Sequence, residues 1–389
     1  MYLDLAVSSW DQAELDAIND VIASDMFTMG ARVKEFETAF ASYFGVKHGV
    51  MVNSGSSANL VAVAAFAYRK QGALKPGDEV LVPAIAWATT YSPLHQYGLK
   101  MRVVDVELDS LNMDVALLEA ALTPKTKAIV GVSILGNPAK LDVMRAFADK
   151  HGLLFLEDNC ESADAELNGQ KTGTFGDIGT FSFFFSHHLM TIEGGMALTD
   201  DDELAQLMRC IRAHGWTRDL GEKSHLHEPL EDSFNEAYRF LLPGYNVRPT
   251  EISGAIGLRQ LEKLPRFTET RRANLARFES LFGPDERFII QKENGKSSSF
   301  CFPIILNPAM ALDRNAAFEA LKQADVGFRM ITGGNVLRHD VAEIYGFENR
   351  DACPNADQAH YRGFFVGNHP KDIRDKLDTV YKVLDRALS

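Results

Sequence analysis

The chain has 389 residues, 46% of them hydrophobic and 24% charged, a composition typical of a globular protein with room for two domains. Its formal net charge of −13 argues against a nucleic-acid surface, because phosphate backbones are bound by clustered lysine and arginine, but it permits a local basic pocket for a small anion. No apolar stretch of about 18 residues is free of charge, and the N-terminal residues lack the pattern of a signal peptide, so the sequence predicts no membrane span and a cytoplasmic location.

Predicted helices and strands alternate from about residue 9 to residue 185. Ser9 is predicted to cap a first helix, and Gly45 is predicted to end a second helix with apolar residues at helical spacing. Short apolar runs predict strands at 48–52, 79–83, 101–106, 128–134 and 153–156. Helical patterns separate most of them, including an alanine-rich helix that ends near Lys70 and helices at 114–122 and 141–151. This alternation predicts an α/β fold with a mostly parallel sheet covered by helices on both faces.

The pattern changes after the turn at 243–246. A long charged helix is predicted at about 250–281 and is expected to break at Pro265, because proline lacks the backbone N–H that a helix interior needs. An apolar run at 300–306 and a helix at 314–324 follow it. We therefore predict a large domain of residues 1–250 and a smaller α+β C-terminal domain of residues 251–389.

The four cysteines lie far apart, and no two of them form a C-x-x-C pair. They are Cys160, Cys210, Cys301 and Cys353. This spacing is typical of unlinked thiols in a reducing compartment, and it predicts neither a zinc site nor an iron–sulfur site. The sequence therefore predicts no bound metal.

A segment of small residues follows the first predicted strand. It contains Gly55, Ser56 and Ser57 and leads into the alanine-rich helix. The first backbone N–H groups of a helix have no partner within it, so small side chains around them leave a ready anion site. The alternative is an ordinary helix cap with a glycine turn.

Asp158 stands just beyond the predicted strand at 153–156. Ligands of open α/β sheets bind at this edge of the sheet, so the carboxylate could hold a protonated ring nitrogen. The alternative is a helix cap or a surface acid, and for a single aspartate that alternative is the more common one.

The segment 181–195 is the most informative in the chain. It resembles the lysine segment of the DegT/DnrJ/EryC-type sugar aminotransferases, which use pyridoxal phosphate; in that family a Ser-Phe pair precedes the cofactor lysine and a Glu-Gly-Gly turn follows it. The family spacing, seven residues back from Gly194, reaches His187 in place of the lysine. An imidazole cannot form the covalent bond that tethers the cofactor, but it transfers protons near neutral pH because its ordinary pKa is about 6.5. The sequence therefore predicts a retained cofactor site and a changed reaction.

Further segments carry the same resemblance, and together they are specific although no single one is. They lie at 26–30, 135–138, 157–162, 212–218, 243–249 and 365–369. The resemblance covers most of the chain. It implies the aspartate aminotransferase-like fold, which is fold type I of the pyridoxal phosphate enzymes.

The resemblance also implies roles for individual residues. In the family, Asp158 matches the carboxylate that pairs with the ring nitrogen, and the phosphate-binding positions match Gly55, Ser56, Ser57 and Ser182. Trp87 matches an aromatic residue that stacks on the cofactor ring, with a buried core tryptophan as the alternative.

Two more matched positions bear on the reaction and on the assembly. Glu161 lies where typical aminotransferases carry glutamine or histidine, and we expect it at the cofactor. Asn246 matches an asparagine that reaches the phosphate from the neighbouring subunit, which implies a homodimer with shared active sites.

Within the family, the resemblance is strongest to enzymes that use pyridoxamine phosphate to remove the 3-hydroxyl group of a nucleotide-linked 4-keto-6-deoxyhexose. GDP-4-keto-6-deoxy-D-mannose, in colitose formation, is the best-matching substrate. The products implied are the 4-keto-3,6-dideoxy sugar and ammonia, with glutamate regenerating pyridoxamine phosphate from pyridoxal phosphate, and His187 acting first as a base and then as an acid. Candidates for contact with the substrate's pyrophosphate, which could equally be surface or interface residues, are Arg218, Arg248 and Arg329.

Other interpretations stay open. A dehydratase of CDP-linked sugars also has histidine for lysine, but it needs an iron–sulfur cluster and a reductase partner, and the cysteines here are not clustered. A non-catalytic protein that only binds a sugar nucleotide is disfavoured by the retained residues Ser56, Asp158, Ser182 and Asn246. A metal site at His187 and His188 is disfavoured because adjacent side chains diverge on most backbones, so we expect a structural role for His188.

Overall fold

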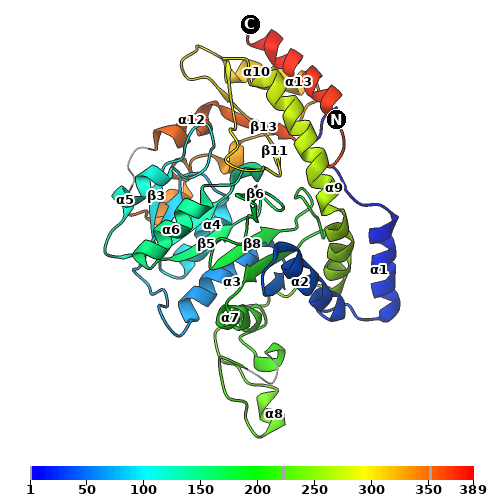
Figure 1. Ribbon diagram of the computed structural model, residues 1–389, viewed down its shortest axis with the longest axis vertical. Coiled ribbons are helices and arrows are strands. Elements are labelled where there is room, and N and C mark those ends of the chain that lie inside the picture. The colour runs from blue at the N-terminus through cyan, green and yellow to red at the C-terminus, as the bar shows by residue number, and fades with distance from the viewer. Residues whose placement is uncertain (1, 221–223, 350–352) are drawn as a thin grey trace.

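The computed structural model describes residues 2–220, 224–349 and 353–389 (Figure 1). Its centre is a seven-stranded sheet in the order β1-β9-β8-β5-β4-β2-β3. The strands are β1 (His48–Val52), β2 (Glu79–Pro83), β3 (Lys100–Val104), β4 (Thr126–Val132), β5 (Leu154–Asp158), β8 (Ile178–Ser182) and β9 (Gly195–Thr199). Strands β3, β2, β4, β5 and β8 run parallel, whereas β9 is antiparallel to both β8 and β1. The predicted α/β fold with a mostly parallel sheet is confirmed.

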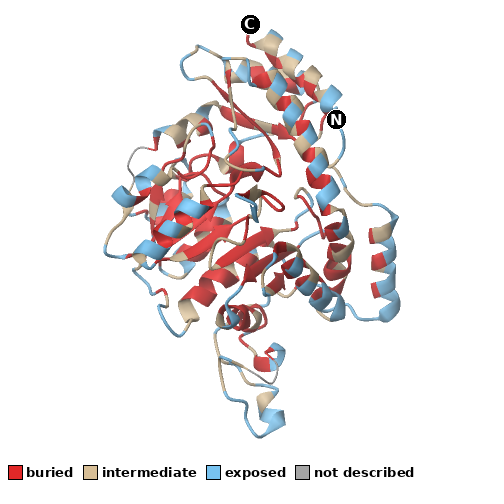
Figure 2. Ribbon diagram, viewed as in Figure 1, coloured by how far each residue is buried: buried red, intermediate tan, exposed pale blue. Residues whose placement is uncertain are grey.

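Both faces of this sheet are buried, which explains why its strands read as continuous apolar runs (Figure 2). In β2, Val80 and Val82 pack into the cluster that contains α3 (Gly55–Tyr68), whereas Leu81 points to the opposite face and packs with α6 (Leu141–His151). Further helices of this part are α1 (Gln12–Ser24), α2 (Ala31–Phe44), α4 (Ala88–Gln96), α5 (Leu118–Ala121) and α7 (Asp202–Arg212).

A second, antiparallel sheet lies at the other end of the molecule, with the order β10-β11-β13-β12. Its strands are β10 (Phe288–Ile290), β11 (Cys301–Leu306), β12 (Phe328–Arg329) and β13 (Gly363–Gly367). It packs with α10 (Arg314–Gln323), α13 (Arg374–Ala387) and the C-terminal end of α9 (Glu251–Phe282), and Leu3 from the N-terminus joins the same cluster. The remaining short elements are β6 (Glu166–Leu167), β7 (Gln170–Lys171), α11 (Val341–Tyr345) and α12 (Pro354–Arg362). The division of the chain at residues 250 and 251 stays a prediction.

Helix α9 runs for 32 residues through Pro265, so the predicted break at this proline was wrong. Proline removes one helical hydrogen bond, but Leu264 and Phe267 on either side of it are buried, and α9 packs along α1 and α2. Most helix stability in proteins comes from such packing, and here it carries the helix across the proline.

The first helix also begins later than predicted. Asp11 and not Ser9 caps it, because the Asp11 carboxylate accepts the N–H of Ala13 at 2.9 Å and the Glu14 carboxylate accepts the N–H of Asp11 at 2.8 Å. Ser9 instead donates to the Gln260 side chain at 2.7 Å, so it ties the N-terminal segment to α9.

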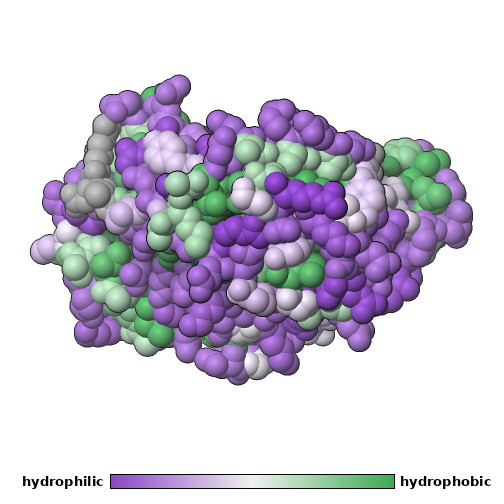
Figure 3. Space-filling model, turned by 90° about the horizontal axis from the view of Figure 1, so that it is seen from above, coloured by the Kyte–Doolittle hydropathy of each residue, from purple (hydrophilic) through white to green (hydrophobic). Residues whose placement is uncertain are grey.

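An arm between residues 213 and 250 projects from the body beyond α7, with α8 (Ser233–Glu236) near its far end (Figure 1). Four of its apolar side chains are exposed, namely Leu230, Phe234, Tyr238 and Phe240. The face of the molecule seen from above is instead mostly hydrophilic, with small apolar patches (Figure 3). Across the described ranges of the chain, no helix combines the length and the apolar character needed to cross a membrane.

Candidate active site

The N-terminus of α3 forms an anion-binding cup. Ser54 caps the helix, and its hydroxyl accepts the N–H of Ser57 at 3.1 Å. The N–H groups of Gly55 and Ser56 have no acceptor within the described part of the chain, so they are free to bind a ligand together with the positive end of the helix dipole. The Ser56 hydroxyl lies 2.8 Å from that of Thr89 at the start of α4.

Ser182, at the end of β8, lies directly against Gly55. A Cβ atom at position 55 would be 2.6 Å from the Ser182 Cβ, so only glycine allows this approach. The Ser57 hydroxyl, by contrast, donates to the Asn53 side chain at 2.6 Å and so faces away from the cup. The structure thus brings Gly55, Ser56 and Ser182 together; their contact with a phosphate stays a prediction, as does that of Ser57.

Asp158 ends β5 and is buried, with 4% of its surface exposed. Its carboxylate accepts hydrogen bonds from the side chains of Asn59 at 2.9 Å and Thr90 at 2.8 Å, and from the N–H of Cys160 at 3.2 Å. Asn59 is itself fixed by the Thr180 hydroxyl at 2.6 Å. All these donors are neutral, and no ion pair of Asp158 occurs in the described residues, so the buried charge is available to a cationic N–H of a ligand.

His187 lies in the turn after β8, and its Nδ1 is 2.8 Å from the carbonyl oxygen of Cys160. A carbonyl only accepts, so Nδ1 carries the hydrogen and Nε2 of the neutral ring keeps its lone pair. Burial lowers the pKa of His187 to about 4, against the opposing effects of the Cys160 carbonyl and the Asp158 charge. At neutral pH the ring is therefore an uncharged base, with its hydrogen on Nδ1 and its lone pair on Nε2.

His188 points elsewhere. It is 1% exposed, and its Nε2 lies 3.2 Å from the carbonyl oxygen of Ser298 in the small domain. Burial lowers its pKa well below 6.5. The ring of Phe300 lies between the two histidines, with centroid distances of 5.1 Å to His187 and 5.7 Å to His188. These contacts support the structural role expected for His188.

Glu161 joins the two domains beside the site. Its carboxylate accepts the N–H of Leu135 at 2.9 Å and the hydroxyl of Thr332 at 3.2 Å. Burial raises the pKa of Glu161 to about 7; the Leu135 N–H lowers it, and the nearby charge of Asp158 raises it further. Thr332 has φ of +39°, a strained conformation for a β-branched residue, in the segment of the small domain that reaches the site.

Trp87 precedes α4 and is 59% exposed, which excludes a buried core tryptophan. The residues that follow it in the chain contact the site, since Thr89 lies against Ser56 and Thr90 donates to Asp158. Trp87 therefore precedes two residues that contact the site, and the stacking of its indole on a cofactor ring stays a prediction.

Asn246 is exposed, and its side-chain oxygen accepts from Nε of Arg248 at 3.1 Å. The next residue, Val247, accepts the N–H of Asn53 at 2.9 Å, so this segment passes the start of the cup within the same chain. The structure places Asn246 on an open surface, as a contact with a neighbouring subunit requires.

The candidate pyrophosphate-binding arginines lie on two separate segments, because Arg248 belongs to the same arm as Arg218. Arg218 is on the arm, with its guanidinium 5.1 Å from the ring centroid of Trp216, and Arg329 is exposed in β12. Neither these two nor Arg248 forms an ion pair with a carboxylate in the part of the chain that the structure covers, so their charges are free for an anion. Their contact with substrate stays a prediction.

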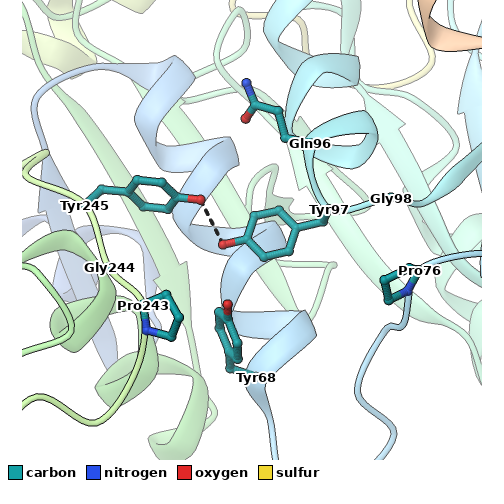
Figure 4. Close-up of a pocket in the computed structure, with 8 residues that line it drawn as sticks. All are labelled: Tyr68, Pro76, Gln96, Tyr97, Gly98, Pro243, Gly244 and Tyr245. Atoms are coloured by element: carbon teal, nitrogen blue, oxygen red, sulfur yellow. Dashed lines mark hydrogen bonds between the residues drawn. The ribbon is translucent and has the colours of Figure 1, made fainter.

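A surface hollow of about 490 Å³ lies away from this site (Figure 4). Tyr68, Tyr97 and Tyr245 line it, and the hydroxyls of Tyr97 and Tyr245 are 3.0 Å apart. Tyr68 is the last residue of α3, whereas the cup is at the first, and a helix of this length spans about 20 Å. The hollow is therefore separate from the candidate active site.

The model of the DegT/DnrJ/EryC1/StrS aminotransferase family matches residues 8–385, and the chain belongs to this family. It is 46% identical to GDP-4-keto-6-deoxy-D-mannose 3-dehydratase of Yersinia pseudotuberculosis over 384 residues, which cover 98% of each chain. It is similar to a structure of GDP-4-keto-6-deoxymannose-3-dehydratase with a trapped PLP–glutamate geminal diamine, with a TM-score of 0.96 and 45% identity over 98% of this chain and 100% of the other. A mutant of that enzyme with bound GDP-perosamine matches with the same identity, coverage and TM-score. The predicted family and the aspartate aminotransferase-like fold are confirmed.

The sequence prediction missed several side chains that shape the site. Asn59 and Thr90 hold Asp158, and Thr89 lies against Ser56. The sequence could have indicated these residues. Asn59 lies one helical turn beyond Gly55, and the two threonines follow Trp87 within three residues. Thr332 carried no such signal, since only the packing of the two domains brings it to Glu161.

The two histidines should differ in their contribution to stability. Replacing His188 with Asn should lower the free energy of unfolding by about 1–3 kcal/mol, because a buried hydrogen bond and the packing against Phe300 are lost. Replacing half-buried His187 with Asn should change it by less than about 1 kcal/mol. Urea denaturation of both purified variants measures the difference, and a larger loss for His187→Asn would contradict these positions.

Proposed function

We propose that this protein is a vitamin B6-dependent 3-dehydratase that acts on GDP-4-keto-6-deoxy-D-mannose. One observation carries the proposal: the position of the family's cofactor lysine is occupied by His187, whose Nδ1 is engaged by the Cys160 carbonyl and whose Nε2 is free. The 46% identity over nearly the full length of a GDP-4-keto-6-deoxy-D-mannose 3-dehydratase supports the same reaction and substrate.

The residues of the site fit pyridoxal phosphate and its amine form, pyridoxamine phosphate. The unpaired N–H groups of Gly55 and Ser56, with the Ser182 hydroxyl, would hold the phosphate, and the buried Asp158 would hold the protonated ring nitrogen. When bound, the amine form supplies a nitrogen that condenses with the C4 ketone of the sugar and a ring that withdraws electrons. Asp158 would bind the N–H of that ring, since its own donors in the protein are all neutral.

Trp87 and Glu161 complete the assignment of cofactor-binding residues. The exposed indole of Trp87 stands beside Thr89 at the cup, where it would cover one face of the ring. Glu161 lies in the turn after Asp158, and its pKa of about 7 lets it carry a proton at neutral pH and donate it in a hydrogen bond.

His187 moves the proton of the reaction. The uncharged ring takes up, at Nε2, the proton that the reaction releases. The resulting imidazolium then delivers that proton to the C3 hydroxyl as this group leaves. A lysine amine at this position would bind the cofactor covalently and divert the chemistry. Hydrolysis then yields the 4-keto-3,6-dideoxy sugar and ammonia, and glutamate restores the amine form of the cofactor.

The GDP portion of the substrate needs cations, and Arg218, Arg248 and Arg329 have guanidinium groups without carboxylate partners among the residues described. The CDP-sugar alternative needs a cysteine cluster. The four cysteines lie far apart, on a turn, on α7, in β11 and before α12, so nothing in the site favours that alternative.

We further propose a homodimer in which each active site uses both subunits, located in the cytoplasm. Asn246 is exposed on a segment that passes the cup, where the corresponding residue of a second copy would reach the phosphate. The exposed apolar side chains of the neighbouring arm need a partner surface, and a second copy provides one by symmetry.

The purified protein should convert GDP-4-keto-6-deoxy-D-mannose, with pyridoxal phosphate and glutamate present, to the 3-deoxygenated ketone with release of ammonia. His187→Asn should lower kcat by about 100-fold to 10,000-fold, the range of general acid–base catalysis, whereas His188→Asn should keep at least about a tenth of it. Mass spectrometry of the nucleotide sugar and an ammonia assay measure both. A 4-amino sugar as product, or an active His187→Asn enzyme, would contradict the proposal.

Shared sites predict complementation between two inactive variants. His187→Asn and Asn246→Ala chains, refolded together at equal concentrations, should regain about a quarter of wild-type activity, because half of the dimers are mixed and each mixed dimer has one intact site. Each variant refolded alone is the control. No recovery, in a mixture that light scattering shows to be dimeric, would mean that each site belongs to one chain.

A further inference from the structure

A buried arginine without a counter-charge lies behind the two histidines. Arg271 in α9 is 3% exposed, and no carboxylate pairs with it among the described residues. Its Nη1 donates only to carbonyl oxygens, at 3.4 Å to Ser299, 3.0 Å to Phe300 and 3.0 Å to Asn368, and its Nε has no partner in the same ranges. Burying an unpaired guanidinium lowers the stability of the fold. Stability alone therefore does not explain why an arginine occupies this position.

Two of the three carbonyls that Arg271 binds belong to a loop of residues 298–300, which is hydrogen-bonded to the segment 135–136. The N–H of Ser298 donates to Gly136 at 2.9 Å, and the N–H of Phe300 donates to Leu135 at 2.9 Å. Ser299 has φ of +45° and is held from the other side by the Asn368 amide, which donates to its carbonyl at 3.0 Å and to its hydroxyl at 2.9 Å. Arg271 and Asn368 together therefore fix the strained centre of the 298–300 loop.

This loop faces the histidines. The Ser298 carbonyl lies 3.2 Å from Nε2 of His188, and the Phe300 ring packs 5.1 Å from the imidazole of His187. Any movement of the loop therefore moves the apolar wall of His187.

Two charged groups act on His187 from opposite sides. The Asp158 carboxylate, at the end of β5, raises its pKa, and the Arg271 guanidinium, from α9, lowers it. Besides these, the Cys160 carbonyl raises the pKa of His187 and burial, which includes the Phe300 ring, lowers it most.

We propose that Arg271 is a positioning residue for His187: it fixes the 298–300 loop that seats Phe300 against the imidazole. The inference rests on the proposed role of His187 as the base, because a ring that starts uncharged can accept a proton at Nε2. This positioning role accounts for the buried guanidinium of Arg271.

The first test uses protein without cofactor and compares Arg271→Met with Arg272→Met. Arg272 is the matched control, because it also donates to a carbonyl of this region, that of Ser297 at 2.8 Å, but it does not act on the charge of His187. NMR titration of ring-labelled histidine, with His187→Asn to identify the signal, follows protonation of His187 in each protein.

In the wild type and in Arg272→Met, His187 should stay uncharged down to about pH 5. In Arg271→Met its titration should move upward, because the 298–300 loop no longer seats Phe300 against the imidazole and the opposing charge is gone. The acid limb of kcat/KM should move to higher pH in the same variant only. An unchanged His187 titration in Arg271→Met would overturn the proposal, and it would do so independently of whether the proposed substrate is correct.

Arg271→Lys provides the second test if the methionine variant does not fold. Lysine keeps the charge, but its compact ammonium on a shorter side chain does not reproduce the planar guanidinium that the carbonyls of this loop surround. Its kcat should fall at least about tenfold with little change in KM, because the loop and Phe300 are loosened, and its His187 titration should move upward by less than that of Arg271→Met, because the charge is kept. A lysine variant with wild-type kcat would overturn the positioning role.

Discussion

The hydrogen bond between Nδ1 of His187 and the carbonyl of Cys160 is the interaction on which the site depends. It sets the tautomer, so the lone pair at Nε2 is the one that can take up a proton. The same turn carries Asp158, whose carboxylate accepts the N–H of Cys160. The base, in the turn after β8, and the residue assigned to the ring nitrogen, at the end of β5, are thus both hydrogen-bonded to the backbone of Cys160. Burial lowers the pKa of His187, so the imidazole is uncharged at neutral pH, as a base must be before it takes up a proton.

The site needs both domains, and the backbone is strained where they meet. Leu135, Ser299 and Thr332 all have positive φ, at 56°, 45° and 39°, and all three lie within one hydrogen bond of Glu161 or of the loop behind His187. Strain of this kind persists only where surrounding contacts impose it, and it gathers at functional sites. Leu135 links the two sets of contacts, because its N–H donates to Glu161 while its carbonyl accepts from Phe300. Contacts of the segments at 135, 298–300 and 332 therefore shape the surroundings of both Glu161 and His187.

Residues with a local reason for their position could be predicted from the sequence. The strands at 48–52 and 79–83 and the helix at 141–151 have the bounds that the structure shows, because short apolar runs and helical periodicity are local signals. Asp158 and the cup could be proposed from the sequence because they follow predicted strands at the edge where ligands of such sheets bind. Thr332, Arg271 and the continuity of α9 through Pro265 were not found, since each depends on packing between segments far apart in the chain. Strands β8 and β9 were missed for a related reason: β9 is antiparallel and breaks the strand–helix alternation on which the prediction relied.

The central claim is that an imidazole replaces the covalent anchor, so the cofactor works while held only by non-covalent contacts. Reduction with sodium borohydride of the protein loaded with pyridoxal phosphate, followed by intact mass and peptide mapping, tests this directly. The account predicts no stoichiometric adduct in the wild type and a single adduct at position 187 in a His187→Lys variant. A stoichiometric adduct on any residue of the wild-type site would contradict it.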